Sequence, residues 1–402
     1  MRANPGGMIA PAEVVGRDRL IAELWRVLEQ RSLVLDAERR IGKTCMIRKM
    51  TAEPPPGVVA VYRDLEGMRT PQEFAESVVR DGLNHLGRIG RTAWKLKRWA
   101  GKLGGAELKG KFKLPEDLGP HWKALLEEFC SALCEGREER VLFFWDEVPL
   151  MLQNFMRRDG GAEAMELLDL LRSLRQTTPN LRMVFTGSIG IANLIDRLHE
   201  TGHPGDPTND MAQVDVPPLA HVHAVRLAHA LFLGEGLLPE GSPPDAACEL
   251  LAAETDGVPY YIHHLVDRLA IEKERPTTAR IRALIERALR DPADPWHLAH
   301  FRERLLPSYG PARGPLARRV LDLLAFEDDL CGFARLANLL AGTGAPVPAD
   351  DLRPMLRALT RDHYLIREEG WRFRFPLVQR WWRRRLEGLE SPRPAATRED
   401  GA

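Results

Sequence analysis

The residues best suited to chemistry in this sequence are Gly42, Lys43 and Thr44. They come after the apolar run "LVLDA" and the arginine-rich turn "ERRI", and more apolar residues follow them. A strand that turns into a helix here directs several backbone N–H groups toward one place, where the helix dipole favours anions. Gly42 would let the backbone approach phosphate groups, Lys43 would meet the β- and γ-phosphates, and Thr44 would bind Mg²⁺. The sequence therefore predicts a site for ATP and Mg²⁺.

The loop departs from the common pattern G-x-x-x-x-G-K-[ST] at one position, where Ala37 replaces the first glycine. Glycine is favoured at that turn for its conformational freedom. Alanine is compatible with the turn if φ is negative, but it distorts or weakens the loop if φ must be positive. We predict that Ala37 is tolerated and that the loop binds phosphate.

Two later apolar runs end in polar residues that suit the same site. "VLFFWDE" ends in Asp146 and Glu147, and "LRMVFTGS" carries Thr186 and Ser188 at its end. We expect Asp146 to hold the metal through water and Glu147 to polarise the attacking water. Thr186 and Ser188 would then sense the γ-phosphate. The alternative is that these residues are ordinary polar strand ends, which are common.

The elements that must position these residues alternate between strands and helices. This order predicts an α/β fold with a parallel sheet. Together with the phosphate loop, we expect it to be the sheet of a P-loop NTPase, with helices on both faces. From residue 217 the pattern is helical, and the last part reads as three helices and a hairpin, which is the order of a winged helix. The predicted divisions are a P-loop α/β domain (1–216) with a basic insertion at about 86–118, a helical domain (217–290), a linker (291–311), a winged-helix domain (312–390) and a disordered tail (391–402).

The composition excludes a global attraction to nucleic acid or anionic lipid. The chain has 402 residues, of which 44% are hydrophobic and 28% are charged, and its formal net charge is zero. Any binding to nucleic acid or lipid therefore needs a local patch. No apolar run reaches the length of a membrane span, and the N-terminus lacks the apolar core of a signal peptide. With five scattered cysteines as well, we expect a cytoplasmic protein of two or three domains.

Several stretches, taken in chain order, resemble motifs of the AAA+/STAND type of P-loop ATPase, especially the bacterial and archaeal predicted ATPases related to origin-recognition proteins. They are "VVGRD", "ERRIGKT", "FFWDEVPLML", "FTGSIGI" and "TDGVPYYIHHL", and the resemblance covers about residues 13 to 388. It implies that the helical domain is a lid and that a winged helix completes the layout. The residues that it assigns to nucleotide binding are Val15, Gly16 and Arg17 at the adenine, Arg40, Ile41, Gly42, Lys43, Thr44 and Cys45 in the loop, and Gly257 and Pro259 in the lid; Thr44 and Asp146 are assigned to the metal.

The sequence also departs from this family at the arginines. Many STAND proteins carry an arginine in the sensor, which this chain lacks, and no arginine finger can be assigned. The candidates for that role are Arg172, Arg175 and Arg182. Nucleotide binding is therefore better supported by the motifs than hydrolysis.

Two functions fit these features. The first is an ATP-driven switch, a Mg²⁺-dependent ATPase whose lid repositions the winged helix. The alternative is a winged-helix DNA-binding regulator with a degenerate or structural nucleotide site. The stretch "WRFRFPLVQRWWRRR" holds six arginines and no acid, and it could grip DNA phosphates. It could equally pack inward through Trp381 and Trp382. The partners considered are ATP, DNA, an unidentified protein and a second copy of the chain.

Overall fold

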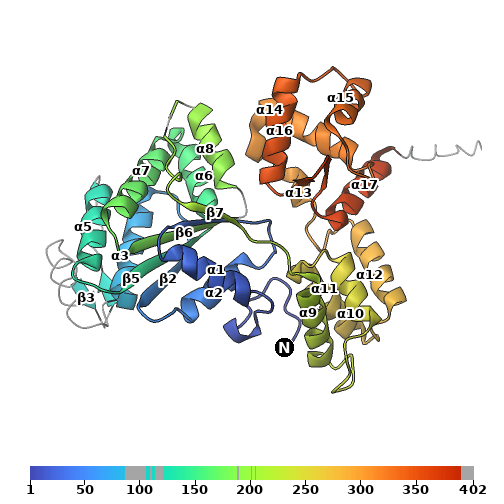
Figure 1. Cartoon of the computed structure of the whole chain (residues 1–402), viewed down its shortest axis with the longest axis horizontal. Helices are drawn as coiled ribbons and strands as arrows, with labels where there is room; N and C mark the ends of the chain where they lie inside the picture. Colours follow the sequence, from blue (N-terminus) through green and yellow to red (C-terminus); the bar gives the residue numbers. More distant parts are fainter. Residues whose placement is uncertain are drawn as a thin grey trace, which may run out of the picture. The chain divides into compact units, whose positions relative to one another are not determined.

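The structure is a computed structural model that describes residues 1–86, 106–108, 111–113, 121–187, 190–200, 202–203 and 205–390. The chain divides into two compact units (Figure 1). The first unit is residues 6–219, and the second joins residues 1–5 to residues 220–402. In the described part of the chain, no helix is long and apolar enough to cross a membrane.

The first unit is built on a five-stranded sheet in the order β2-β5-β6-β1-β7. All neighbouring strands in it are parallel, and β6 lies between β1 and β5. The carboxyl ends of β1, β5 and β6 therefore meet at one edge of the sheet. The strands are β1 (Leu33–Asp36), β2 (Val58–Asp64), β5 (Arg140–Asp146), β6 (Leu181–Gly187) and β7 (Ala212–Asp215).

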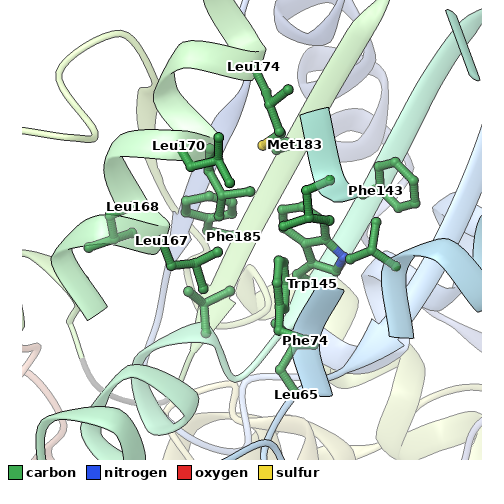
Figure 2. Packing of buried hydrophobic residues seen from close by; sticks show 14 of the residues in the cluster. Leu65, Phe74, Phe143, Trp145, Leu167, Leu168, Leu170, Leu174, Met183 and Phe185 are labelled. Carbon is green, nitrogen blue, oxygen red and sulfur yellow. The ribbon is translucent and has the colours of Figure 1, made fainter. Parts of the chain in front are cut away.

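Both faces of this sheet are apolar, which explains why its central strands read as continuous apolar runs. On one face, Phe143, Trp145 and Phe185 pack against Phe74 and a group of leucines (Figure 2). On the other face, the Trp25 ring meets the edge of Phe144 at 6.0 Å between centroids. The helices of the first face are α3 (Pro71–Leu86), α5 (Trp122–Cys134), α6 (Val148–Asp159), α7 (Ala162–Thr177) and α8 (Ile191–Glu200), and α1 (Asp18–Leu28) and α2 (Lys43–Ala52) cover the second. The prediction of a parallel α/β sheet with helices on both faces is confirmed.

The predicted basic insertion at about 86–118 lies mostly outside the described residues. Within it the structure describes β3 (Ala106–Leu108) and β4 (Lys111–Lys113), which pair antiparallel.

Among its described residues, the second unit is helical apart from one antiparallel hairpin. The prediction of a hairpin within "HYLIREEGWRFRFP" is confirmed by β8 and β9, and Cys331 adds an isolated bridge to Trp371. The elements are α9 (His221–Gly234), α10 (Ala246–Glu254), α11 (Pro259–Glu272), α12 (Thr278–Arg290), α13 (His300–Glu303), α14 (Leu305–Leu324), α15 (Phe333–Gly342), α16 (Ala349–Arg361), β8 (Leu365–Arg367), β9 (Trp371–Phe373) and α17 (Pro376–Glu390).

The expected linker at 291–311 differs from the structure in its second half, which contains α13 and the start of α14. Prolines suggested an irregular segment there. Gly310 has non-helical backbone (φ 70°, ψ 176°) and interrupts α14, so Pro311 begins a new helical stretch. Proline is well tolerated in a first helical turn, because the N–H that it lacks has no partner there anyway. The proline signal therefore marks a kink between helices at this point.

Candidate functional site

The predicted phosphate loop connects β1 to α2 as the sequence indicated. Gly42 is the residue before α2, and its φ of 92° is in the left-handed region that favours glycine. A Cβ added at Gly42 would meet nothing within 4 Å, so the requirement for glycine is conformational and not one of space. The first-turn N–H groups of α2 lack helical partners and are available to an anion.

Ala37 is buried and is not among the described residues with positive φ. The methyl group therefore imposes no left-handed strain on the turn. The left-handed residue before the glycine is instead Arg40, with a φ of 73°. Non-glycine residues in this region cost roughly 1–2 kcal/mol. Any strain in this loop thus falls on Arg40 and not on the position that departs from the common pattern.

The side chain of Lys43 is buried at the carboxyl edge of the sheet. Its Nζ donates hydrogen bonds to the carbonyl oxygens of Ala37, at 2.8 Å, and of Gly187. Burial lowers the pKa of Lys43, because desolvation penalises the charged amine, and four carboxylates act in the opposite direction, those of Glu147, Asp146, Glu38 and Asp36. A bound anion would offset the cost of burying this charge. The loop therefore fits a phosphate group.

Asp146 ends β5 beside this loop and is buried. Its Oδ2 accepts a hydrogen bond from Thr44 Oγ1 at 2.7 Å, and its Oδ1 accepts one from Thr186 Oγ1. The Tyr62 hydroxyl lies 3.4 Å from the same Oδ2. Sequence reasoning named Thr44, Asp146 and Thr186 but missed Tyr62. The structure thus brings together residues from α2, β2, β5 and β6.

Magnesium prefers oxygen ligands and is commonly held by one or two carboxylates together with phosphate oxygens. The Thr44 hydroxyl and the Asp146 carboxylate supply oxygen ligands of this kind. Their hydrogen bond shows that the two oxygen atoms lie close enough to bind one ion. These two residues would hold Mg²⁺, so the residues present fit the ion.

Glu147 follows β5 directly and precedes α6. Its backbone is left-handed, with φ 58° and ψ 36°, and its N–H donates to Asp146 Oδ1 at 3.2 Å. Such backbone is uncommon for non-glycine residues and is often found at functional sites. The strand ends at Asp146, and Glu147 lies in the turn that leads into α6, which suits a role separate from that of Asp146.

Cys45, Gly257 and Pro259 were also assigned to nucleotide binding by the resemblance. Cys45 lies in α2 and is a free, partly exposed thiol. Gly257 has a φ of 67°, and its N–H donates to Ala252 O at 3.1 Å, which ends α10. Pro259 is the first residue of α11, a favourable position for proline. Both belong to the second unit. Ser188 lies outside the described residues.

The three arginine-finger candidates are all held within the first unit. Arg175 is buried and pairs with Asp210 at 2.8 Å, which makes it unavailable to an external ligand. Arg182 donates to the carbonyl oxygen of Leu181 at the amino end of β6, opposite the edge that carries the site. Arg172 donates to Asp206 O at 3.2 Å. Within the described residues, these contacts give no support to an arginine finger at the candidate site.

The arginine-rich stretch at α17 packs within the second unit. Arg380 pairs with Glu254 and, at 2.9 Å, with Glu286. Arg384 pairs with Glu286 as well, and Arg383 pairs with Asp328 at 2.6 Å. These guanidinium groups are therefore engaged by carboxylates of the same unit.

The tryptophan pair in α17 is also turned inward. Trp381 and Trp382 are buried, with an edge-to-face contact of 6.1 Å between ring centroids. Trp382 Nε1 donates to Asp322 Oδ1 at 2.7 Å, which ties α17 to α14. Of the two interpretations of this stretch, internal packing accounts for these contacts better than DNA contact.

Solved structures share this fold. No family model matches the chain, and no curated protein sequence matches it. A Walker-type ATPase of Pyrococcus abyssi has a TM-score of 0.65 at 19% identity, over 95% of this chain and 100% of that chain. The ORC2 protein of Aeropyrum pernix, in its ADPNP–ADP complexes, has a TM-score of 0.53 at 12% identity, over 96% and 98%. At these identities the likeness concerns the fold, which is that of a P-loop NTPase.

Proposed function

We propose that the chain binds ATP with Mg²⁺ and hydrolyses it, and that it works as a nucleotide-controlled switch of the AAA+ type. The observation that carries the proposal is the 2.7 Å hydrogen bond between Thr44 and Asp146, beside the buried ammonium of Lys43. A hydroxyl, a carboxylate and a cation at a helix N-terminus are the groups that nucleotide phosphates and Mg²⁺ require.

Each residue at the site has a separate task in this proposal. Lys43 exchanges its carbonyl partners for the β- and γ-phosphates, and the Gly42 region supplies N–H groups to them. Bound Mg²⁺ would neutralise charge that develops on the phosphates. Glu147 polarises the attacking water, and Thr186 holds Asp146 in place through its hydroxyl.

The second unit supplies the moving part in this proposal. We assign residues 217–290 to a lid and residues 312–390 to a winged helix, on the basis of the helix order, the β8–β9 hairpin and the Gly257–Pro259 turn. The lid would respond to nucleotide and reposition the winged helix. The paired arginines and buried tryptophans of α17 do not favour the alternative of a DNA-binding regulator.

The proposal is tested by measuring ATP binding to the full chain with and without Mg²⁺. Lys43→Ala removes the buried cation of the loop and should abolish binding of labelled ATP. Lys49→Ala is the matched control, because Lys49 lies in the same helix but pairs with Glu53 at 3.2 Å. Equal binding by the parent and by Lys43→Ala would refute the phosphate-loop assignment.

A further inference from the structure

Arg17 connects two distant parts of the first unit. It immediately precedes α1, and it is only 4% exposed. Its Nη2 donates to the carbonyl oxygen of Ile41 at 2.8 Å, and its Nη1 donates to that of Pro217 at 2.7 Å. Ile41 belongs to the phosphate loop, and Pro217 belongs to the segment by which the chain leaves the first unit at Leu219. One guanidinium group therefore joins the loop to the exit of the unit.

The contact with Ile41 has a consequence for the phosphate loop. The Ile41 carbonyl and the Gly42 N–H belong to one peptide group, which is planar and trans, so they point in opposite directions. By holding the carbonyl, Arg17 fixes the direction of the Gly42 N–H at the start of α2. N–H groups in this position are the ones that bind phosphate. A phosphate that turned this peptide would alter the bond to Arg17.

The contact with Pro217 anchors a stiff segment. The N–H of Val216 donates to Asp36 O at 2.8 Å, which continues the pairing of β7 with β1. Pro217 and Pro218 follow, and proline has no N–H with which to extend the ladder. The Pro217 carbonyl can still accept a hydrogen bond in this segment, and Arg17 donates to it.

We propose that Arg17 is a positioning residue that couples the phosphate loop to residues 212–219, so that nucleotide binding changes the freedom of the exit to the second unit. This inference rests on the proposed function. The planar guanidinium can serve two carbonyls in a fixed geometry, whereas the ammonium of lysine is a flexible point charge. Arg17→Lys therefore keeps the positive charge and breaks the coupling.

The two hydrogen bonds of Arg17 are donated by a buried group that keeps its charge. Desolvation lowers the pKa of Arg17 to about 10, so the group is still charged at neutral pH. A hydrogen bond from a charged donor corresponds to roughly a tenfold or larger change in an equilibrium constant. Losing either contact should therefore have a measurable effect on the loop or on residues 212–219.

The test is hydrogen exchange of the full chain, with and without Mg²⁺ and the non-hydrolysed analogue ADPNP. The peptide to follow covers residues 212–223, and nucleotide affinity is measured in parallel. In the parent, we expect the analogue to slow exchange in this peptide. Both proteins are compared at analogue concentrations that saturate them, as set by the measured affinities, and Arg17→Lys should then lack that response. Arg19→Lys is the control, because Arg19 is 94% exposed and pairs with Glu23.

The outcomes separate this inference from the proposed function. If Arg17→Lys binds the analogue and keeps the full exchange response, Arg17 does not couple the two segments and the inference is overturned. A parent that binds the analogue without any response in residues 212–223 overturns it as well, and the nucleotide site stands in both cases. A parent that binds no analogue overturns both proposals. A purely structural role would change the exchange rate equally with and without the analogue, which also counts against coupling.

Discussion

Ala37 and Arg40 lie in the same loop, and of the two it is Arg40 that has left-handed backbone, with φ at 73°. Glycine and alanine should therefore have opposite effects at the two positions. At residue 40, we predict that Arg40→Gly is more stable than Arg40→Ala by about 1 kcal/mol, because left-handed backbone is costly for residues with a Cβ. At residue 37, Ala37→Gly should lose about 0.4–1 kcal/mol through greater freedom of the unfolded chain.

Urea unfolding of the full chain measures both differences. ATP affinity should change only modestly in Ala37→Gly, since in the proposed function the phosphate contacts come from the start of α2. A large gain in stability or affinity from Ala37→Gly would show that alanine does strain the loop, contrary to this account.

Asp256 should make stability depend on pH. Its Oδ2 accepts a hydrogen bond from the Leu377 N–H at 3.0 Å, at the start of α17. Desolvation raises the pKa of Asp256 to about 7, helped by Glu254 and opposed by the Leu377 hydrogen bond and by Arg380 and Arg372. Because the folded pKa lies above the unfolded value, the stability that this group contributes is present at about pH 4 and is lost as the pH rises through about 7.

Asp256→Asn removes this titration and leaves an oxygen that accepts the same hydrogen bond. Relative to the parent, we predict that the variant gains unfolding free energy between pH 5 and pH 8, on the order of 1.4 kcal/mol for each unit of pKa shift. Urea unfolding across this range is the measurement, with Glu369→Gln, at an exposed position of the same unit, as control. A difference that stays constant with pH would mean that Asp256 has an ordinary pKa.

The arginines of α17 should act mainly on stability. Arg384 pairs with Glu286, whereas the neighbouring Arg385 is exposed. We predict that Arg384→Gln lowers the free energy of unfolding by about 1 kcal/mol, and that Arg385→Gln changes it by less than about 0.5 kcal/mol. Any binding to duplex DNA, measured at low and high salt, should be no weaker in Arg384→Gln than in Arg385→Gln. If Arg384→Gln kept full stability but lost DNA binding, the internal-packing account would be wrong.

The sequence was sufficient for features that depend on local pattern. The apolar runs before Asp36, Asp146 and Thr186 predicted buried parallel strands, and these strands carry the residues of the site to one edge. The loop before Lys43 was found because its residue types and their spacing follow directly from the needs of a phosphate group. Such signals lie within a few residues of one another and need no knowledge of the tertiary structure.

Features that depend on distant contacts could not be predicted in this way. Tyr62 reaches Asp146 because β2 pairs with β5, and only the register between the two strands shows it. Arg17 was assigned to adenine by resemblance, whereas its guanidinium holds two carbonyls; its role at adenine stays a prediction. The ion pairs of α17 join residues that are far apart in the sequence, so composition alone could not decide between DNA contact and packing.

The central claim is that this site hydrolyses ATP, and Glu147→Gln tests it most directly. The substitution keeps the size of the side chain and removes the carboxylate that would polarise water, while Lys43, Thr44 and Asp146 stay in place. The measurement is phosphate release from Mg²⁺·ATP by the full chain, with ATP binding measured on the same samples. We predict that the parent releases phosphate and that Glu147→Gln binds ATP as tightly but releases at least tenfold less, as expected for loss of a general base, which contributes about 10²–10⁴-fold. Equal release by both proteins, or a parent that releases no phosphate, would contradict the account.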